Sequence, residues 1–221
     1  MLFRPTSPRQ EETRTAGLSV LLVDMREALG NGLEIRPLRT MMNHASTELF
    51  FTDLAVPREN LIGIEGKGFG YILDGMNAER ILIAAECIGD ARFFIDRGAA
   101  YAAEREVFGQ PIGGNQGIQF PLAQAYARTE AAAAIVRQAC ELYELAESCG
   151  SEANMAKLLA AEASWQAADT CVQTHGGYGF TEEYDIERKF RETRLYQVAP
   201  ISTNLILSHL ATHELGLPKS F

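Results

Sequence analysis

The sequence predicts an α+β protein that is mainly α, with a C-terminal antiparallel four-helix bundle and a partial β domain at the N-terminus. Two observations carry this prediction. Before about residue 65, short β-branched runs alternate with turn residues, as strands do. After it, apolar residues recur every three or four positions almost to the end of the chain, which is the spacing of a buried helix face. We therefore place a partial β domain at residues 1–65 and the helical-bundle domain at residues 66–221.

The predicted strands are short. Residues 17–24, 33–37 and 47–54 each contain an apolar or β-branched run, and Asn31-Gly32 is a turn signal between the first two. Three strands on their own make a poor sheet, with exposed edges and little core. We expect this region to be part of a β domain whose other half is absent or supplied elsewhere.

The helical part begins with one very long helix, residues 69–105, which ends at the glycines and proline of residues 109–114. A 3.5-residue repeat then predicts a bundle seam on the next helix. Its positions are Leu122, Tyr126, Thr129, Ala133, Val136, Cys140 and Tyr143. The remaining helices are predicted at residues 152–174, 185–191 and 201–215. Pro200 is expected in the first turn of the last helix, where its missing N–H is harmless.

Composition narrows the class of protein. A net charge of -9 and a pI near 5.0 argue against nucleic acid and against an anionic membrane surface as partners. No run reaches the ~18 apolar residues of a membrane span, and residues 1–14 lack the apolar core of a signal peptide. The four cysteines form no Cys-x-x-Cys pair, which predicts buried reduced thiols and a cytoplasmic location.

Glu79 occupies a position where an apolar residue is expected. Spacings of three and four residues place Met76, Glu79 and Ile83 on one helix face, and apolar residues fill the other faces too. A carboxyl group buried there needs a partner, or its pKa rises by as much as ~3–5 units. A raised pKa suits a general base. The alternative is a structural ion pair with Arg80 or another cation.

Two loops could bind an anionic cofactor. Arg105 and Phe108 place a cation and an aromatic ring at the end of the long helix, although a cation that favours the helix dipole is the alternative. Residues 173–179 form a glycine-rich turn that would let the backbone approach a phosphate or an adenine, although a helix C-cap is the alternative. No metal site is predicted, because no clear ligand set accompanies His209 and His213.

Six segments together resemble the acyl-CoA dehydrogenase family in their order and spacing. They are residues 56–63, 77–80, 104–109, 115–120, 173–180 and 191–197. The resemblance implies FAD as cofactor, oxidation of an acyl-CoA thioester to a 2-enoyl-CoA, an electron-transfer flavoprotein as partner, and a homodimer or homotetramer. A family enzyme has an N-terminal helical domain, a middle β domain and a C-terminal bundle, and this chain resembles only the second half of the β domain and the bundle.

The resemblance also assigns residues to sites. The implied cofactor-binding residues are Arg105, Phe108, Gln116, Gln173, Gly176 and Gly177. The first two match a loop that contacts FAD across a dimer interface, the third lies close to that loop, and the last three match the turn that holds the pyrophosphate and adenosine end. The implied substrate-binding residues are Met76, Asn77 and Arg80, of which the arginine lies beside the catalytic carboxylate and the CoA chain.

The catalytic Glu of most family members follows a Tyr-Gln motif, and Pro200 occupies that position here. A minority, including isovaleryl-CoA dehydrogenase, carry the Glu immediately before the arginine of the long helix, which is Glu79 here. Pro200 has no N–H to hold the thioester carbonyl, and losing one such donor typically costs ~2.7–4 kcal/mol. Either a neighbouring N–H substitutes or the substrate pose differs.

Two other functions stay open. The chain could be a truncated, non-catalytic subunit or fragment without a complete FAD site. It could also be an acyl-CoA oxidase or a flavin monooxygenase on the same fold.

Overall fold

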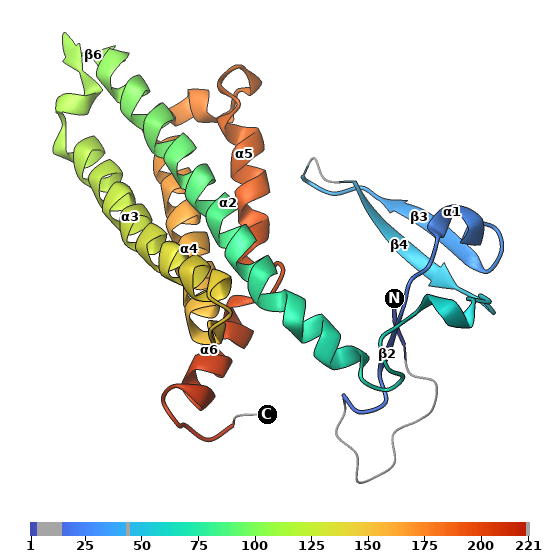
Figure 1. Ribbon diagram of the computed structural model, residues 1–221. Coiled ribbons are helices and arrows are strands. Elements are labelled where there is room, and N and C mark those ends of the chain that lie inside the picture. The colour runs from blue at the N-terminus through green and yellow to red at the C-terminus, as the bar shows by residue number, and fades with distance from the viewer. Residues whose placement is uncertain (4–14, 43–44, 220–221) are drawn as a thin grey trace. The chain divides into compact units, whose positions relative to one another are not determined.

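The computed structural model describes residues 1–3, 15–42 and 45–219 (Figure 1). It divides the chain into two compact units, Met1–Met76 and Asn77–Phe221, and each is described by itself. The boundary falls inside the long helix α2 (Gly68–Glu104), which begins in the first unit and continues into the second.

The first unit contains two small antiparallel sheets, and all three predicted strands are present. The first sheet has the order β1 (Leu2–Phe3), β2 (Ser19–Leu21), β5 (Leu61–Ile62). The second pairs β3 (Leu33–Leu38) with β4 (Ser46–Phe51), and a short helix α1 (Met25–Ala28) and a 3-10 turn η1 (Arg58–Asn60) complete the unit. On β4 the side chains of Leu49, Phe50 and Phe51 are exposed, so these strands bury little apolar surface by themselves.

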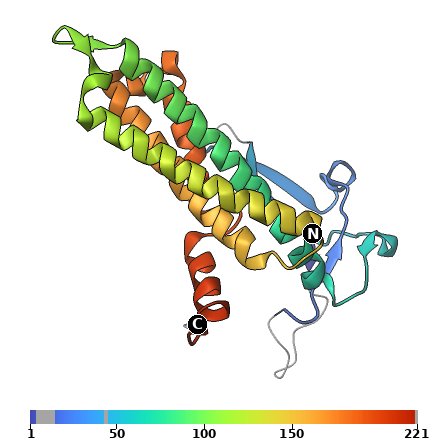
Figure 2. The ribbon, with the colours of Figure 1, turned by 60° about the vertical axis from the view of Figure 1, so that its left-hand side comes forward.

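The second unit is the predicted helical bundle. Its further helices are α3 (Gln116–Glu144), α4 (Gly150–His175), α5 (Ile186–Thr193) and α6 (Thr203–His213). A hairpin of β6 (Glu106–Val107) and β7 (Gln110–Pro111), followed by the 3-10 turn η2 (Ile112–Gly114), joins α2 to α3. The 3-10 turns η3 (Gly176–Phe180) and η4 (Glu182–Tyr184) join α4 to α5, and η5 (Arg194–Gln197) follows α5. Figure 2 shows α2, α3 and α4 side by side.

Helix α4 contributes many buried residues to the core, and its apolar face is built largely from alanines. Ala153, Ala156, Ala160, Ala163 and Ala167 are all buried against neighbouring helices. Such small side chains let helix axes approach closely. The predicted seam on α3 is confirmed at Thr129, Ala133 and Val136, but it is wrong at Tyr126 and Tyr143, whose side chains are exposed. Alanines 125, 132 and 139 of α3 are buried in the contact with the neighbouring helices instead.

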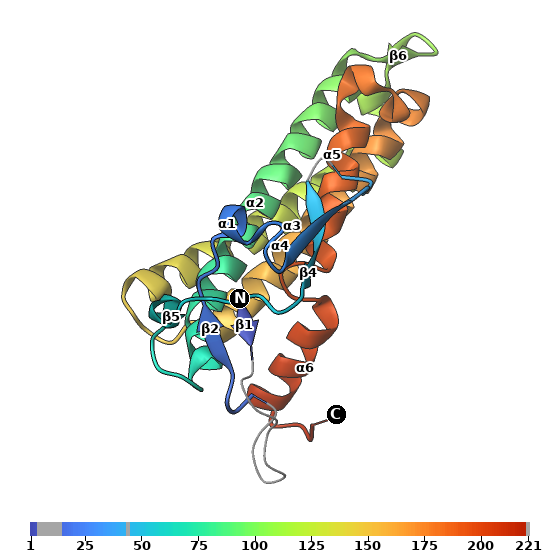
Figure 3. The ribbon, with the colours of Figure 1, turned by 90° about the vertical axis from the view of Figure 1, so that its right-hand side faces the viewer.

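The last two helices complete the bundle. Helix α5 packs along α4, and α6 follows it beyond η5 (Figure 3). Helix α6 begins at Thr203 because the hydroxyl of Ser202 accepts a hydrogen bond from the Leu205 N–H. The expectation that Pro200 lies in its first turn is therefore wrong, since Pro200 precedes the cap.

The four cysteines are free thiols, and Cys87, Cys149 and Cys171 are buried, as predicted. Within the described residues, no helix combines the length and the apolar character that crossing a lipid bilayer requires.

Candidate active site

The β6–β7 hairpin projects from one end of the bundle (Figure 2). Its two turn residues, Phe108 and Gly109, have φ angles of 55° and 80°. Positive φ at both central positions is the requirement of a type I′ hairpin turn. The Phe108 ring is fully exposed at 101%. The hairpin thus holds an aromatic side chain away from the core of its own chain.

The end of α4 lies at the same end of the bundle. Gly176 has a φ of 58° and its N–H caps α4 by donating to the carbonyls of Val172 and Gln173. A Cβ added at Gly176 or at Gly177 would meet no atom within 4 Å, so both glycines have an open face. Gly179 differs, because its Cβ would lie 2.8 Å from the Val172 carbonyl oxygen. The turn therefore needs a glycine at position 179 for packing, whereas Gly176 and Gly177 border open space.

A cavity of about 450 Å³ joins the hairpin base to this turn. Its lining residues are Tyr101, Arg105, Val107, Ile112, Gln173, Thr174, His175, Gly176, Gly177, Tyr178 and Thr181. Four of the predicted cofactor-binding residues, Arg105, Gln173, Gly176 and Gly177, therefore meet in one place. Two others, Phe108 and Gln116, do not line the cavity; the first is at the hairpin tip and the second is exposed in the first turn of α3.

The aromatic part of the cavity was not predicted. The His175 ring stacks on Tyr101 with centroids 4.1 Å apart, and Tyr178 also lines the space. His175 Nδ1–H donates to the Cys171 carbonyl at 2.8 Å, and burial lowers the pKa of His175, which favours the neutral imidazole. One signal was available: Tyr101 precedes Arg105 by one helical turn, so the two share a face.

The charges in the lining favour an anion. Arg105 is its one arginine, and the described lining includes no carboxylate. A guanidinium beside glycine backbone and flat aromatic rings suits a ligand that combines phosphate with an aromatic base.

The predicted catalytic residue, Glu79, and the predicted substrate contacts lie far from this cavity. Helix α2 runs 25 residues from Glu79 to Glu104, about 38 Å at 1.5 Å per residue. The Glu79 side chain is exposed, so the prediction that it is buried is wrong for this chain. Its apolar neighbour Leu82 is 67% exposed as well, because the described part of the chain covers only one side of α2 at this position. The structural ion pair with Arg80 is not formed either, since no such pair occurs among the described residues.

Asn77 and Arg80 do interact. Arg80 Nη1 donates to Asn77 Oδ1 at 2.9 Å, and both residues are half-buried. Arg80 Nε is buried with no hydrogen-bond partner in the described part of the chain. Burial lowers the pKa of Arg80, and the nearby Glu79 carboxylate opposes that shift. Met76, the last residue of the first unit, is half-buried.

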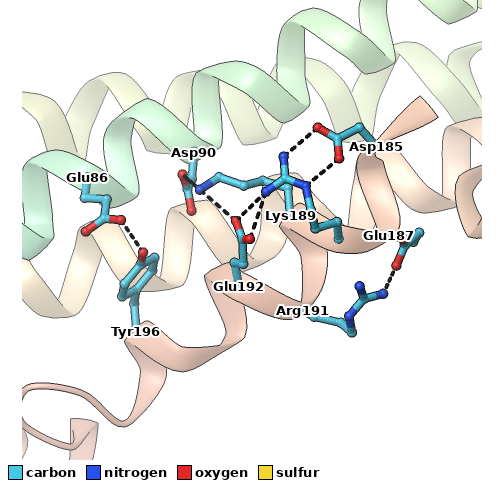
Figure 4. Close-up of polar contacts among 9 residues, drawn as sticks. Glu86, Asp90, Asp185, Glu187, Lys189, Arg191, Glu192 and Tyr196 are labelled. Carbon is cyan, nitrogen blue, oxygen red and sulfur yellow. Dashed lines mark hydrogen bonds and ion pairs between the residues drawn. The ribbon is translucent and has the colours of Figure 1, made fainter. Parts of the chain in front are cut away.

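The segment that carries Pro200 is tied to the bundle. The Tyr196 hydroxyl donates to the Glu86 carboxylate of α2 (Figure 4). Gln197 Nε2 donates to the Ala161 carbonyl at 2.8 Å, and Lys157 Nζ donates to the Ile201 carbonyl at 2.7 Å. These two hydrogen bonds connect the segment that carries Pro200 to α4.

A charge network fixes α5 beside α2 (Figure 4). Lys189 Nζ lies 2.6 Å from Asp90 Oδ1 and 3.4 Å from Glu192 Oε2, and Arg188 bridges Glu192 and Asp185. Burial raises the pKa of Asp90 and the Lys189 ammonium opposes this shift. Because α5 leads directly into η5, the network also sets the position of the Tyr196–Ser202 segment.

The fold defines the class: it is the helical-bundle fold found in solved acyl-CoA dehydrogenases. The profile described as "Acyl-CoA dehydrogenase, C-terminal domain" matches residues 66–211, and the chain belongs to the acyl-CoA dehydrogenase family. An acyl-CoA dehydrogenase of Mycobacterium bovis is 36% identical over 216 residues, which is 96% of this chain and 56% of that protein. The chain thus spans about half the length of the curated relatives it matches.

Two further relatives extend the comparison. A caffeyl-CoA reductase-Etf complex subunit of Acetobacterium woodii is 32% identical over 185 residues, covering 83% of this chain and 48% of that protein. The crystal structure of an acyl-CoA dehydrogenase from Geobacillus kaustophilus superposes with a TM-score of 0.88 at 29% identity, covering 94% of this chain and 55% of that one. These matches confirm the predicted family and fold class.

Proposed function

We propose that this chain is part of a flavin-dependent acyl-CoA dehydrogenase that oxidises an acyl-CoA thioester to a 2-enoyl-CoA. One observation carries the proposal. Arg105, Gln173, Gly176 and Gly177, chosen from the sequence as cofactor residues, line a single cavity with a cation and no carboxylate. Family membership alone would be compatible with a degenerate cofactor site, and the cavity argues against one.

The adenosine and pyrophosphate end of FAD, the cofactor that the family resemblance implies, is the proposed occupant of the cavity. Arg105 would pair with the pyrophosphate, and the open faces of Gly176 and Gly177 would let it approach the backbone. The Tyr101–His175 stack offers a flat surface for the adenine. Bound FAD would supply the acceptor for the hydride that leaves the substrate β-carbon.

Glu79 is the proposed base, with Met76, Asn77 and Arg80 as the proposed substrate contacts. Proton removal from the α-carbon places negative charge on the thioester oxygen, so the reaction also needs hydrogen-bond donors aimed at that oxygen. Arg80 has a buried Nε without a partner, which makes it a candidate contact for substrate. Exposure of Glu79 means that other protein surface must exclude water from this base during turnover.

The two ends of α2 would serve different active sites. About 38 Å of helix separates Glu79 from the cavity, so one extended cofactor would have to reach far along the bundle to meet both. The fully exposed Phe108 ring at the hairpin tip also suits contact with another copy. We therefore propose a homodimer or homotetramer in which Arg105 and Phe108 contact the flavin bound by a neighbouring copy.

An electron-transfer flavoprotein is the proposed electron acceptor. Support comes from the relative in Acetobacterium woodii, whose name places it in a reductase-Etf complex. A cytoplasmic location is proposed on the basis of the four free thiols, since oxidising compartments favour disulfides.

A visible spectrum of the purified chain, with and without added FAD, tests the proposal. We expect a flavin spectrum that persists through gel filtration and bleaches on anaerobic addition of butyryl-CoA. Added FAD that elutes entirely free would contradict the proposed cofactor site. Rapid oxygen consumption with acyl-CoA and no other acceptor would instead indicate an oxidase or monooxygenase.

A non-catalytic subunit or fragment is the second candidate. The exposure of Glu79 and the coverage of about half of the curated relatives favour it. This candidate predicts a colourless chain that binds no FAD alone and gains no bleaching activity. Binding of FAD without bleaching would identify a cofactor-binding fragment.

A further inference from the structure

Lys157 is a buried charge that the proposed reaction does not yet use. Its side chain lies on α4 with 0% exposure. Burial lowers the pKa of Lys157. In the described part of the chain it forms no ion pair with a carboxylate, and its one hydrogen bond goes to the Ile201 carbonyl at 2.7 Å. A buried ammonium is costly unless polar groups compensate it, so stability alone does not explain a lysine here.

The carbonyl that accepts this hydrogen bond shows which peptide group Lys157 holds in place. The Ile201 carbonyl belongs to the peptide group that joins Ile201 to Ser202. In a trans peptide the C=O and the N–H point in opposite directions. Holding the carbonyl toward α4 therefore aims the Ser202 N–H away from α4.

The Ser202 N–H is available for a ligand. Among the described residues it donates to no backbone or side-chain acceptor, although the Ser202 hydroxyl is engaged as the cap of α6. An ammonium on the carbonyl oxygen polarises the peptide group and strengthens its N–H as a donor. Tyr196 and Gln197 hold the same segment from its other end through Glu86 and the Ala161 carbonyl. The peptide is thus fixed on both sides.

We propose that Lys157 is a positioning residue, which orients the Ser202 N–H to hold the substrate thioester oxygen in place of the donor that Pro200 cannot provide. The inference rests on the proposed function. Pro200 lies two residues before Ser202 in the same tied segment and has no N–H of its own. Charge that develops on the thioester oxygen is best stabilised by a donor already fixed in place.

Two substitutions at Ser202 separate the N–H from the side chain. The φ of Ser202 is -71°, which proline adopts without strain, so Ser202→Pro deletes the N–H and keeps the backbone angle. Ser202→Ala keeps the N–H and removes only the hydroxyl cap. In the flavin-loaded enzyme we expect Ser202→Pro to slow bleaching by butyryl-CoA on the order of 10²-fold or more, and far more than Ser202→Ala slows it.

Lys157→Met keeps the side-chain length and removes the charge. Arg92→Met is the control, because it also removes a cation from the bundle, and the ion pair of Arg92 is with Glu130 of α3 and not with residues 196–202. The probe is 2-butenoyl-CoA labelled with ¹³C at the carbonyl, whose stretching frequency falls when donors hold the oxygen. We expect Lys157→Met and Ser202→Pro to lose most of the frequency shift seen with wild-type protein, and Arg92→Met to keep it.

The outcomes distinguish a failure of the inference about Lys157 and Ser202 from a failure of the proposed function. A full frequency shift in both Lys157→Met and Ser202→Pro overturns the inference and leaves the proposed function intact. A wild-type protein that binds FAD but neither bleaches nor shifts the probe overturns both. If Lys157→Met does not fold, the contrast between Ser202→Pro and Ser202→Ala decides the question.

Discussion

The two ends of the helical unit differ in how far this chain builds them. At the cavity end, α2, the hairpin and the α4 turn enclose about 450 Å³ and bring four predicted residues together. At the end that carries the proposed base and substrate contacts, which we name the acyl end, Glu79 is exposed and Arg80 Nε has no partner among the described residues. The cavity is thus lined by several elements of this chain, whereas Glu79 and Arg80 both lie on a single helix.

This difference shows what helical periodicity can and cannot establish. An apolar stripe identifies the face of a helix that will be covered. The covering surface can come from the same chain or from elsewhere. At Ile81, Ala84 and Ile88 it comes from α3 and α4, and at Glu79 and Leu82 the described residues do not supply it. The comparison predicts which substitutions will disturb chemistry, cofactor binding or stability.

The largest expected effect is at the acyl end. Glu79→Gln should lower the rate of bleaching by butyryl-CoA roughly 10²–10⁴-fold, because general-base catalysis contributes about that much, while the flavin stays bound. The rate is measured by anaerobic stopped flow. Glu104→Gln, at the other end of α2 and also exposed, is the matched control. An unchanged rate in Glu79→Gln would exclude Glu79 as the base.

A smaller effect is expected at the cavity end. Arg105→Met should weaken FAD binding about 10- to 100-fold, since a hydrogen bond to a charged group contributes ~1.5–3 kcal/mol. Flavin fluorescence titration measures the dissociation constant. Arg137→Met removes an exposed arginine from α3, outside the cavity lining, and should leave binding unchanged. Equal affinity in both variants would mean that Arg105 does not contact the cofactor.

Two glycines of one turn should behave differently. Gly179→Ala should lower the free energy of unfolding by about 1–3 kcal/mol, because its Cβ would lie 2.8 Å from the Val172 carbonyl oxygen. Gly177→Ala, with no atom within 4 Å, should leave stability within about 0.5 kcal/mol and weaken FAD binding. Urea unfolding and FAD titration measure both properties. Unaltered affinity in Gly177→Ala would place the cofactor away from this face.

The smallest expected effect is the pH dependence of His175. Burial, with repulsion from Arg97, lowers the pKa of His175 below its unfolded value of about 6.5. Stability from this group is therefore complete above pH 6.5 and is lost as the pH falls toward the folded pKa, because the unfolded state binds the proton first. His175→Phe keeps a ring against Tyr101. It should reduce the slope of the free energy of unfolding against pH by at most about 1.4 kcal/mol per pH unit.

Chemical denaturation between pH 5 and pH 8 measures this slope. The difference between wild type and His175→Phe should be constant above pH 7 and shrink below pH 6.5. A difference that stays constant over the whole range would show that His175 has the same pKa in both states. His209, whose pKa burial also lowers, is present in both proteins and cancels in the comparison.

Much of the fold could be predicted because the signals are local. The long helix was expected at residues 69–105 and runs from Gly68 to Glu104, since apolar spacing and the following glycines mark both ends. Arg105, Gln173, Gly176 and Gly177 were found through their motifs. The Tyr101–His175 stack was missed, because it joins α2 to the end of α4 and no local pattern reports a contact between segments so far apart.

The sequence by itself determined the order of the main helices and of the three predicted strands, the family, and the proposed cofactor residues that meet in the cavity, because each depends on short-range spacing. Tertiary structure alone decided that Glu79 is exposed and that Lys157 is buried against a loop carbonyl. Both residues lie on largely apolar helices, so the spacing of apolar residues cannot show which of the two is buried. Whether a charged side chain meets water or a backbone dipole depends on which neighbouring element covers its face, and that is a property of the packed molecule.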